Sequence, residues 1–436
     1  MRFGEGPRDV CFSLIYLKRV EVHACIGMEC GVRSIELFAG GGGLLLGSAL
    51  AGFSHDAAIE WERNSCDTLR LNQGRDYPLL RGTSIIEGDV RTVDWSQFGD
   101  DLDLLAGGPP CQPFSLGGLA RAALDPRDMF PAMTHALAEL RPRAFIVENV
   151  KGLLRSSFAD YYAYILLRLQ HPLLTANEGE SWKDHLTRLS REHTNGVHDE
   201  LRYEVVPTLV DAADYGVPQH RHRVIMVGFR SDVNAQWAFP EPTHSGAALA
   251  AAQQTDDYWD VRQVSRRQRH PLSCRQGNPG LKPWCTVRDA LEGLPAPKDA
   301  ENAVWPNHIA QHGAKMYPGH TGSVLDEPSK AIKAGVHGVP GGENMIRYPD
   351  GRVRYFSTRE AARIQTFPDA YCFSGAWGET MRQIGNAVPV RLAQVVASSV
   401  AIALRQDEIS HSMDEDLFAL THSTTNIVEV NAHAAA

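Results

Sequence analysis

The chain has 436 residues, of which 43% are hydrophobic and 22% charged, and its formal net charge is −9, as in a soluble globular protein of two or three domains. No apolar run reaches the roughly 18 residues that a membrane span requires, and the start lacks the order of a secretory signal. The eight cysteines include no C-x-x-C pair, which argues against a disulfide framework or a thiolate zinc site and favours a reducing cytoplasm.

The first recognisable unit is a strand, a glycine turn and a helix. Residues 1–31 have no clear period and are expected to be an N-terminal extension. Val32–Phe38 then predicts a strand, Ala39–Gly43 a turn, and Leu44–Ala51 a helix. This arrangement is typical of nucleotide binding, because the backbone approaches the ligand where a Cβ would clash.

The spacing of the glycines limits the ligand. A phosphate loop is excluded because Ser48 stands where lysine is required, and a dinucleotide fingerprint is excluded because Leu45 occupies its third glycine position. What remains is Phe38-x-Gly40-x-Gly42, which alone is equally compatible with a plain tight turn.

Acidic residues follow the next two predicted strands. His55–Ile59 ends in Glu60-Trp61, where the carboxylate is placed to accept hydrogen bonds from two ribose hydroxyls and the indole to lie against adenine. Ser84–Glu87 is followed by Asp89-Val90, whose acceptor suits the adenine amine. Either acid alone could be a helix cap or a surface charge. Together with the glycine turn they predict an adenosine-bearing cofactor without a pyrophosphate, and S-adenosylmethionine fits.

A fourth predicted strand, Leu102–Ala106, leads into Gly107-Gly108-Pro109-Pro110-Cys111-Gln112-Pro113-Phe114-Ser115. Three prolines and two glycines make this a stiff loop at a strand end, where ligands bind in such sheets. Because the prolines and glycines hold its thiol in a fixed position, Cys111 is predicted to be a nucleophile rather than a small buried hydrophobic residue.

The fifth predicted strand ends in a carboxylate. After a predicted helix over Met129–Arg141, the strand Ala144–Val147 runs into Glu148-Asn149-Val150. Because this strand lies beside the one that carries the thiol, we expect Glu148 to be partly desolvated and able to hold or share a proton near neutral pH. The alternative is an exposed glutamate at a strand end.

Two arginines precede the last predicted strand of the first domain. Phe158–His171 predicts a helix, 172–200 an insertion of unknown role, and Tyr203–Val210 a sixth strand. Gln219-x-Arg221-x-Arg223 then leads into an apolar strand, and strand alternation would put these three side chains on one face. Two adjacent arginines there would form a fork for phosphate or a base carbonyl, or else a surface charge ladder.

The composition changes near Pro240, where Pro, Gly, Arg, Trp and His increase. This indicates a second, irregular domain with one basic stretch: Arg262, Arg266, Arg267, Arg269, Arg275 and Lys282. His308 and His312 stand four apart without acidic or cysteine company, so no metal site is predicted. Val390–Leu404 predicts a helix that is apolar nearly all round and must pack on the first domain.

These motifs agree in order and spacing with one family. The chain resembles the DNA (cytosine-5) methyltransferases, most closely the bacterial enzymes that partner restriction enzymes. The resemblance covers about Val32 to Leu404 and rests on separate motifs: Phe38–Gly43, Pro109–Gln112, Glu148–Val150, Gln219-x-Arg221-x-Arg223, Arg359–Arg363 and Gly385–Pro389.

The resemblance implies an α/β, Rossmann-like methyltransferase fold with a mixed seven-stranded sheet and a smaller irregular target-recognition domain. The expected divisions are 1–31, an extension; 32–235, catalytic; 236–376, target recognition; 377–405, returning to the catalytic domain; and 406–436, a disordered tail.

The resemblance also implies an activity: methyl transfer from S-adenosylmethionine to C5 of a flipped-out cytosine through a Cys111–C6 adduct. Glu148 would stabilise protonation at N3, and Arg223 with Arg221 would contact O2. The cofactor would be bound by Phe38, Gly40, Gly42, Glu60, Trp61, Asp89, Val90, Pro110 and Asn386, and the substrate by Gln112, Ser115, Asn149 and Gln219.

The expected partners are double-stranded DNA and a cognate restriction endonuclease, with the protein a cytoplasmic monomer, nucleoid-associated while acting. A tRNA-directed member of the family, a catalytically silent DNA-binding regulator and a nicotinamide-dependent oxidoreductase remain alternatives. The long second domain favours DNA, the intact Cys111 and Glu148 count against the regulator, and Leu45 with the proline-framed thiol disfavours the oxidoreductase.

Overall fold

A mixed sheet forms the centre of the protein. The computed structural model describes residues 31–110, 128–196, 200–274, 276–300, 304–334 and 344–433, with side chains as far as His411. Its seven strands have the order β3-β2-β1-β4-β5-β7-β6, in which β7 alone runs antiparallel to both its neighbours. Their bounds are β1 Val32–Leu37, β2 Phe53–Glu60, β3 Ser84–Glu87, β4 Leu104–Gly107, β5 Ala144–Val150, β6 Tyr203–Asp211 and β7 His222–Arg230. The predicted seven-stranded α/β fold is confirmed.

Helices cover both faces of this sheet, because successive side chains of its central strands point in opposite directions. Leu105 packs in the core shared with α3 and α4, whereas Leu104 and Ala106 pack in the core shared with the C-terminal helix. The helices are α1 Gly43–Leu50, α2 Arg63–Gly74, α3 Phe130–Leu140, α4 Ala159–Gln170 and α5 Trp182–Thr194. Helix α5 lies within the insertion predicted over 172–200 and packs on α4.

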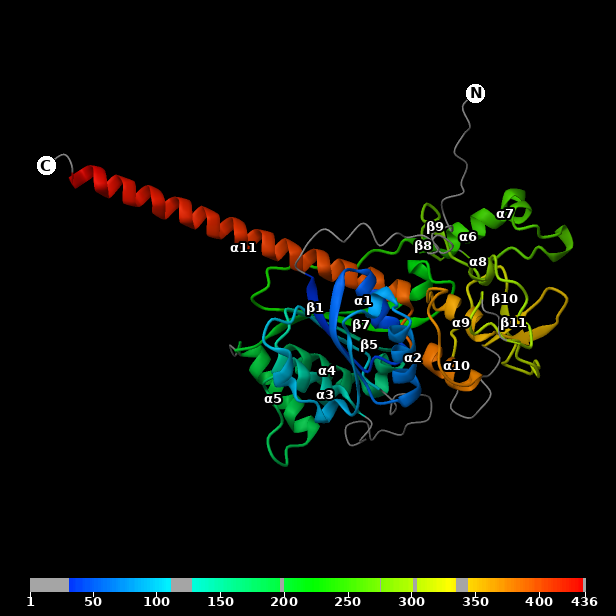
Figure 1. The fold of residues 1–436 in the computed structure, drawn as a ribbon, viewed down its shortest axis with the longest axis horizontal. Coiled ribbons are helices and arrows are strands. Elements are labelled where there is room, and N and C mark those ends of the chain that lie inside the picture. Colours follow the sequence, from blue (N-terminus) through cyan, green and yellow to red (C-terminus); the bar gives the residue numbers. More distant parts are fainter. Residues whose placement is uncertain are drawn as a thin grey trace, which may run out of the picture.

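The second domain lies to one side of the sheet, next to α1 and α2, and has little regular structure (Figure 1). Its elements are β8 His244–Ser245, α6 Gly246–Gln253, α7 Asp256–Val261, β9 Lys282–Pro283, α8 Val287–Leu291, β10 Ser323–Val324, β11 Met345–Arg347, β12 Val353–Tyr355 and α9 Thr358–Ile364. Phe356, Ala361 and Phe367 share a core with Leu45 and Leu46 of α1. The predicted boundary at residue 376 therefore divides elements that pack together.

The chain ends in α10 Trp377–Asn386 and the long helix α11 Val390–His433. As predicted, α11 packs on the first domain, where its residues 390–404 lie against α1. A part of Trp377–His411 is long and apolar enough to cross a membrane, but 61% of that window is buried inside the protein, as in a core helix.

The backbone of α11 continues through the predicted tail to His433 and extends away from the body (Figure 1). No glycine or proline occurs after Pro389, so the sequence contains no stop signal for this helix.

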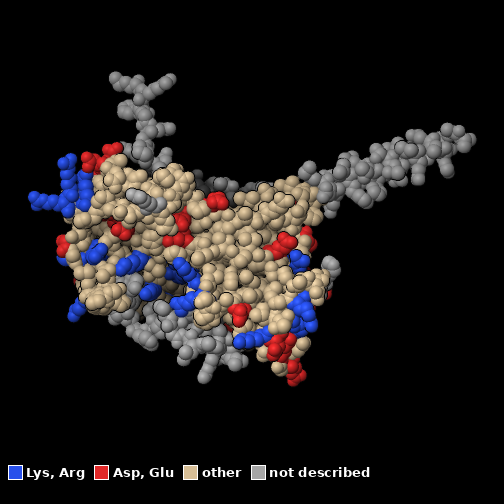
Figure 2. Space-filling view, turned by 180° about the vertical axis from the view of Figure 1, so that it is seen from behind, with Lys and Arg blue, Asp and Glu red and all other residues tan. Residues whose placement is uncertain are grey.

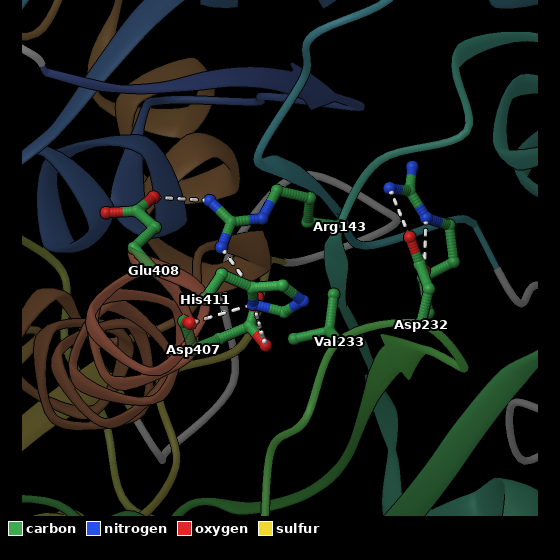
Figure 3. Close-up of a pocket in the computed structure, with 7 residues that line it drawn as sticks. Arg143, Asp232, Val233, Asp407, Glu408 and His411 are labelled. Carbon is green, nitrogen blue, oxygen red and sulfur yellow. Dashed lines mark hydrogen bonds and ion pairs between the residues drawn. The ribbon is translucent and has the colours of Figure 1, made fainter. Parts of the chain in front are cut away.

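Arg143 attaches α11 to the sheet. It donates to Asp103 and to the carbonyl oxygen of Leu404. It also donates to Asp407 and Glu408 (Figure 3). Arg143, Asp407 and Glu408 line a cavity of about 390 Å³ beside the amino end of β5. That cavity is at the opposite end of the strand from Glu148 and is not part of the predicted site.

Candidate active site

The predicted site residues converge because strands β3, β2, β1, β4 and β5 are parallel and end at one edge of the sheet. Strand β7 runs the other way, so its first residues reach the same edge. The order reverses between β1 and β4, because the chain passes from β1 to β2 on one side and β4 lies on the other. A crevice at such a switch point is the usual ligand site of these sheets.

Only one glycine of the turn after β1 has open space beside it. Gly40 has a left-handed φ of +53°, and an added Cβ would meet nothing closer than 3.9 Å. An added Cβ at Gly42 would lie 2.9 Å from the hydroxyl oxygen of Tyr371, and one at Gly43 would lie 2.2 Å from the carbonyl oxygen of Val388. Gly40 therefore leaves space beside its Cα for a ligand, whereas the missing side chains of Gly41, Gly42 and Gly43 make room for the C-terminal segments.

Phe38 introduces this turn with a left-handed φ of +57°, which is uncommon for a residue with a side chain. The turn is tied to β2 by Glu60. Glu60 Oε2 accepts the backbone N–H of Gly40 at 2.7 Å, and its Oε1 accepts those of Trp61 at 2.9 Å and Glu62 at 2.7 Å. Burial raises the pKa of Glu60, although these three hydrogen bonds oppose the shift. The carboxylate thus shapes the loop and keeps one of its roughly four lone-pair sites, on Oε2, free for a ligand.

Trp61 and Asp89 differ in how freely their side chains can contact a ligand. The Trp61 side chain is 73% exposed, so its ring is free to cover a bound base. The Asp89 carboxylate accepts the backbone N–H of Arg91 at 2.9 Å and pairs with the Arg91 guanidinium, which lowers the pKa of Asp89. Val90 is buried directly beside it. Asp89 therefore remains an acceptor candidate whose oxygens already have a partner.

Close packing brings the end of β4 to the end of β5. An added Cβ at Gly108 would lie 3.1 Å from Glu148 Oε2. Asn149 donates its side-chain amide to the carbonyl oxygen of Pro109 at 3.1 Å, and Pro110 is exposed. The proline-containing segment that begins at Pro109 therefore starts next to the Glu148 side chain. Cys111, Gln112 and Ser115 lie outside the described residues.

Glu148 and Arg223 form an ion pair between neighbouring strands. Their side chains are only 10% and 12% exposed, and the contact joins Glu148 Oε1 to Arg223 Nε. Arg223 also donates Nη1 to the carbonyl oxygen of His222 at 2.8 Å. A partly buried carboxylate beside a partly buried guanidinium can bind a planar group that offers both a donor and acceptors.

The prediction that Gln219, Arg221 and Arg223 share a strand face is wrong, because β7 begins only at His222. Arg221 is 2% exposed and donates to the carbonyl oxygens of Ile332 at 2.9 Å and Gly385 at 2.6 Å. Its terminal nitrogens therefore do not form a fork with Arg223.

Gln219 is also buried, and its amide binds the N–H of Ile332 and the side chain of Gln365. These partners lie more than 100 residues away in the sequence, which is why strand alternation could not reveal them. Asn386, by contrast, is exposed at the end of α10, as a ligand-binding residue can be.

The residues that support the glycine turn from the far end of the chain were missed. Tyr371 donates its hydroxyl to the carbonyl oxygen of Gly41 at 3.0 Å, and Gln383 accepts from Thr68 at 2.6 Å. No periodicity indicates such contacts. The nearby Arg359, from a motif that the resemblance had identified, is buried and donates only to backbone carbonyl oxygens.

The arginines of the basic stretch in the second domain are less free to bind an anionic partner than the sequence suggests, because several already form ion pairs. Arg262 pairs with Asp289 at 2.8 Å, and Arg269 pairs with Asp256 and Asp260. Arg266 remains 84% exposed. Lysine and arginine side chains protrude from the outer edge of this domain (Figure 2). Arg275 lies outside the described residues.

The two histidines four residues apart bind other groups. His308 contacts Ser357 and the carbonyl oxygen of Pro295, whereas His312 contacts Asp299. Within the part of the chain that the structure describes, no three His, Cys, Asp or Glu side chains are arranged to hold a metal ion.

Comparisons with known proteins agree with this geometry. A family model for C-5 cytosine-specific DNA methylases matches residues 32–171 and 183–401. Type II methyltransferase M.PspPI of Psychrobacter is 31% identical over 84% of this chain and 78% of its own length. Type II methyltransferase M.NgoMIV of Neisseria gonorrhoeae is 31% identical over 86% of this chain and 98% of its own.

Among solved structures, a prophage-encoded E. coli protein described as a DNA modification methyltransferase has the same fold. It superposes with a TM-score of 0.52 and 20% identity, over 86% of this chain and 99% of that one.

Proposed function

The chain belongs to the C-5 cytosine-specific DNA methylase family, and from this premise we propose how its residues divide the methylation of cytosine C5 in double-stranded DNA. Its Type II methyltransferase relatives support the modification enzyme of a restriction-modification system. That it acts as a monomer beside a cognate endonuclease is part of the proposal. The observation that carries the assignment is the Glu148–Arg223 pair directly below the segment that leads to Cys111.

The residues that end β1, β2 and β3 fit S-adenosylmethionine. Gly40 leaves open space for a close approach, Glu60 Oε2 offers a remaining acceptor site beside it, and Trp61 presents an exposed ring. When bound, the cofactor supplies an electrophilic methyl group. We assign its binding to these three residues with Phe38, Gly42, Asp89, Val90, Pro110 and Asn386.

Cys111 is the proposed nucleophile. The cytosine must first leave the helix, at a cost of roughly a few kcal/mol. The Cys111 thiolate then forms a bond to C6, and the electron pair of the C5–C6 double bond makes C5 nucleophilic toward the methyl group. Loss of the C5 proton restores that double bond and releases the thiolate.

Glu148 and Arg223 are the proposed contacts to the base. Glu148 stabilises a proton at N3 as the ring accepts the thiolate, and Arg223 binds O2 and holds the base against Cys111. Asn149 keeps the proline segment in place through Pro109. Gln112 and Ser115 contact the substrate beside the thiol. Arg221 and Gln219 act on the backbone instead of on the base.

The test is methyl transfer from labelled S-adenosylmethionine to duplex DNA and, in parallel, to tRNA. The proposal expects label in DNA only, and bisulfite sequencing of plasmid from expressing cells then identifies a 5-methylcytosine within one short sequence. Label in tRNA alone would support the tRNA-directed alternative, and no label in either would support the silent regulator.

A further inference from the structure

Gln365 is a fully buried amide with no part in the proposed chemistry, yet it joins the two halves of the site. Its Nε2 donates to the carbonyl oxygens of Ile384 at 2.6 Å and Ala387 at 3.1 Å, which lie on either side of Asn386. Its Oε1 accepts Nε2 of Gln219 at 2.9 Å. One side chain therefore holds both the backbone that presents Asn386 and the segment that leads into β7.

Arg221 makes a second connection between the same two segments. It lies two residues before Arg223, and its Nη2 donates to the carbonyl oxygen of Gly385. Its Nη1 donates to the carbonyl oxygen of Ile332, whose N–H is bound by Gln219 Oε1 at 2.8 Å. The backbone of Ile332 is thus held through both its N–H and its carbonyl oxygen, between the start of β7 and the end of α10.

These contacts leave little freedom for independent movement. Gln365, Gln219 and Arg221 are each no more than 2% exposed, so water cannot replace a hydrogen bond that breaks. An added Cβ at Gly385 would lie 2.4 Å from the backbone nitrogen of Ala334, so the backbones themselves are in contact. A shift of Asn386 must therefore be accompanied by a shift of the segment before Arg223.

We propose that Gln365 is a positioning residue that couples cofactor binding at Asn386 to binding of the DNA base at Arg223. The inference rests on the proposed function, since it takes those two residues as cofactor and base contacts. Coupling between two sites is reciprocal, so S-adenosylhomocysteine strengthens DNA binding by the factor by which DNA strengthens S-adenosylhomocysteine binding.

The experiment measures this factor in the full chain. Affinity for S-adenosylhomocysteine is measured with and without a duplex that carries the sequence found by bisulfite mapping. We expect the wild type to show a coupling of about fivefold or more. Gln365→Met keeps the size of the side chain but removes its hydrogen bonds, and we expect it to reduce the factor to within about twofold of unity.

Gln253 provides the matched control. It is 2% exposed, its Nε2 donates to the carbonyl oxygen of Asp326 at 2.7 Å, and its Oε1 accepts the N–H of Leu272 at 2.6 Å. None of its partners belongs to the proposed site. Gln253→Met removes comparable buried hydrogen bonds, so it reports the effect of reduced stability and should retain the wild-type coupling.

Gln219→Met is the second variant, and it also serves if Gln365→Met does not fold. It breaks the same amide contact from the other side and should lower the coupling likewise. Equal coupling in wild type, Gln365→Met and Gln219→Met would overturn the inference, as would an equal loss in Gln253→Met. A protein that binds neither S-adenosylhomocysteine nor DNA would instead refute the proposed function.

Discussion

The side chain of Glu148 at the end of β5 contacts that of Arg223 at the start of β7, although 75 residues separate them in sequence. The antiparallel register pairs Val150 with Arg223, which brings the two side chains to one end of neighbouring strands. Proton transfer and base orientation can therefore act on one bound ring.

Replacing Glu148 with glutamine keeps the shape of the side chain but removes its charge and its ability to hold a proton. We expect methylation to fall by about 100-fold or more. Affinity for S-adenosylhomocysteine, measured by calorimetry, should stay unchanged because no cofactor contact is assigned to Glu148. A clear loss of that affinity would mean that Glu148 supports the cofactor site.

Cys111→Ser tests covalent catalysis. A hydroxyl is a far weaker nucleophile than a thiolate, so methylation should be abolished while binding to duplex DNA persists. With a duplex that contains 5-fluorocytosine, the wild type should form a protein–DNA adduct that survives denaturing electrophoresis. An active serine variant, or a wild type that gives no adduct, contradicts the mechanism.

Substitutions of the second-domain arginines should have two different effects, one on DNA binding and one on stability. Arg266 is exposed, so replacing Arg266 and Arg267 with alanine should weaken DNA binding and reduce its salt slope by about one for each phosphate that is no longer neutralised. Arg269→Ala removes ion pairs with Asp256 and Asp260 and should mainly lower stability. Binding isotherms over a salt series check this, and an unchanged slope in the double variant would mean that this surface does not meet DNA.

Gly47→Ala should destabilise the packing of α1 on α11. The added Cβ would lie 2.3 Å from that of Ala393, an overlap that costs about 1–3 kcal/mol. Gly378 in α10 is the control, because nothing lies within 4 Å of its Cβ position. Gly378→Ala should be neutral or stabilise by about 0.5–1 kcal/mol. Urea unfolding compares the two, and equal stability would show that α1 and α11 can separate.

The low pKa of buried His55 predicts that the protein loses stability in acid. The His55 side chain is buried between Ser34 and the carbonyl oxygen of Leu45, and burial lowers its pKa to about 4. The folded state resists protonation of His55, whereas the unfolded chain does not. The contribution of His55 to the free energy of unfolding is therefore complete above pH 6.5 and decreases as the pH falls toward 4. His55→Gln retains a donor and an acceptor. Its unfolding free energy should depend less on pH in that window, and an equal dependence would exclude His55 as a source.

The sequence by itself determined where the strands end and which chemical groups follow them. The strands and helices predicted by residue range in the first domain match the structure to within three residues at each end, because periodicity, glycine and proline act over a few neighbours. Parallel strands end at one edge, so Glu60, Asp89 and Glu148 could be assigned to one site from the order of the strands alone.

Only the tertiary structure decided which of those groups are free to act. Arg221 is bound to the carbonyl oxygens of Ile332 and Gly385, and Gly43 is required by the close approach of Val388. Arg262 is neutralised by Asp289, 27 residues further along the chain. The reason is physical: the partner of a buried charge or a close backbone contact comes from whichever distant segment packs there, and no local pattern encodes it.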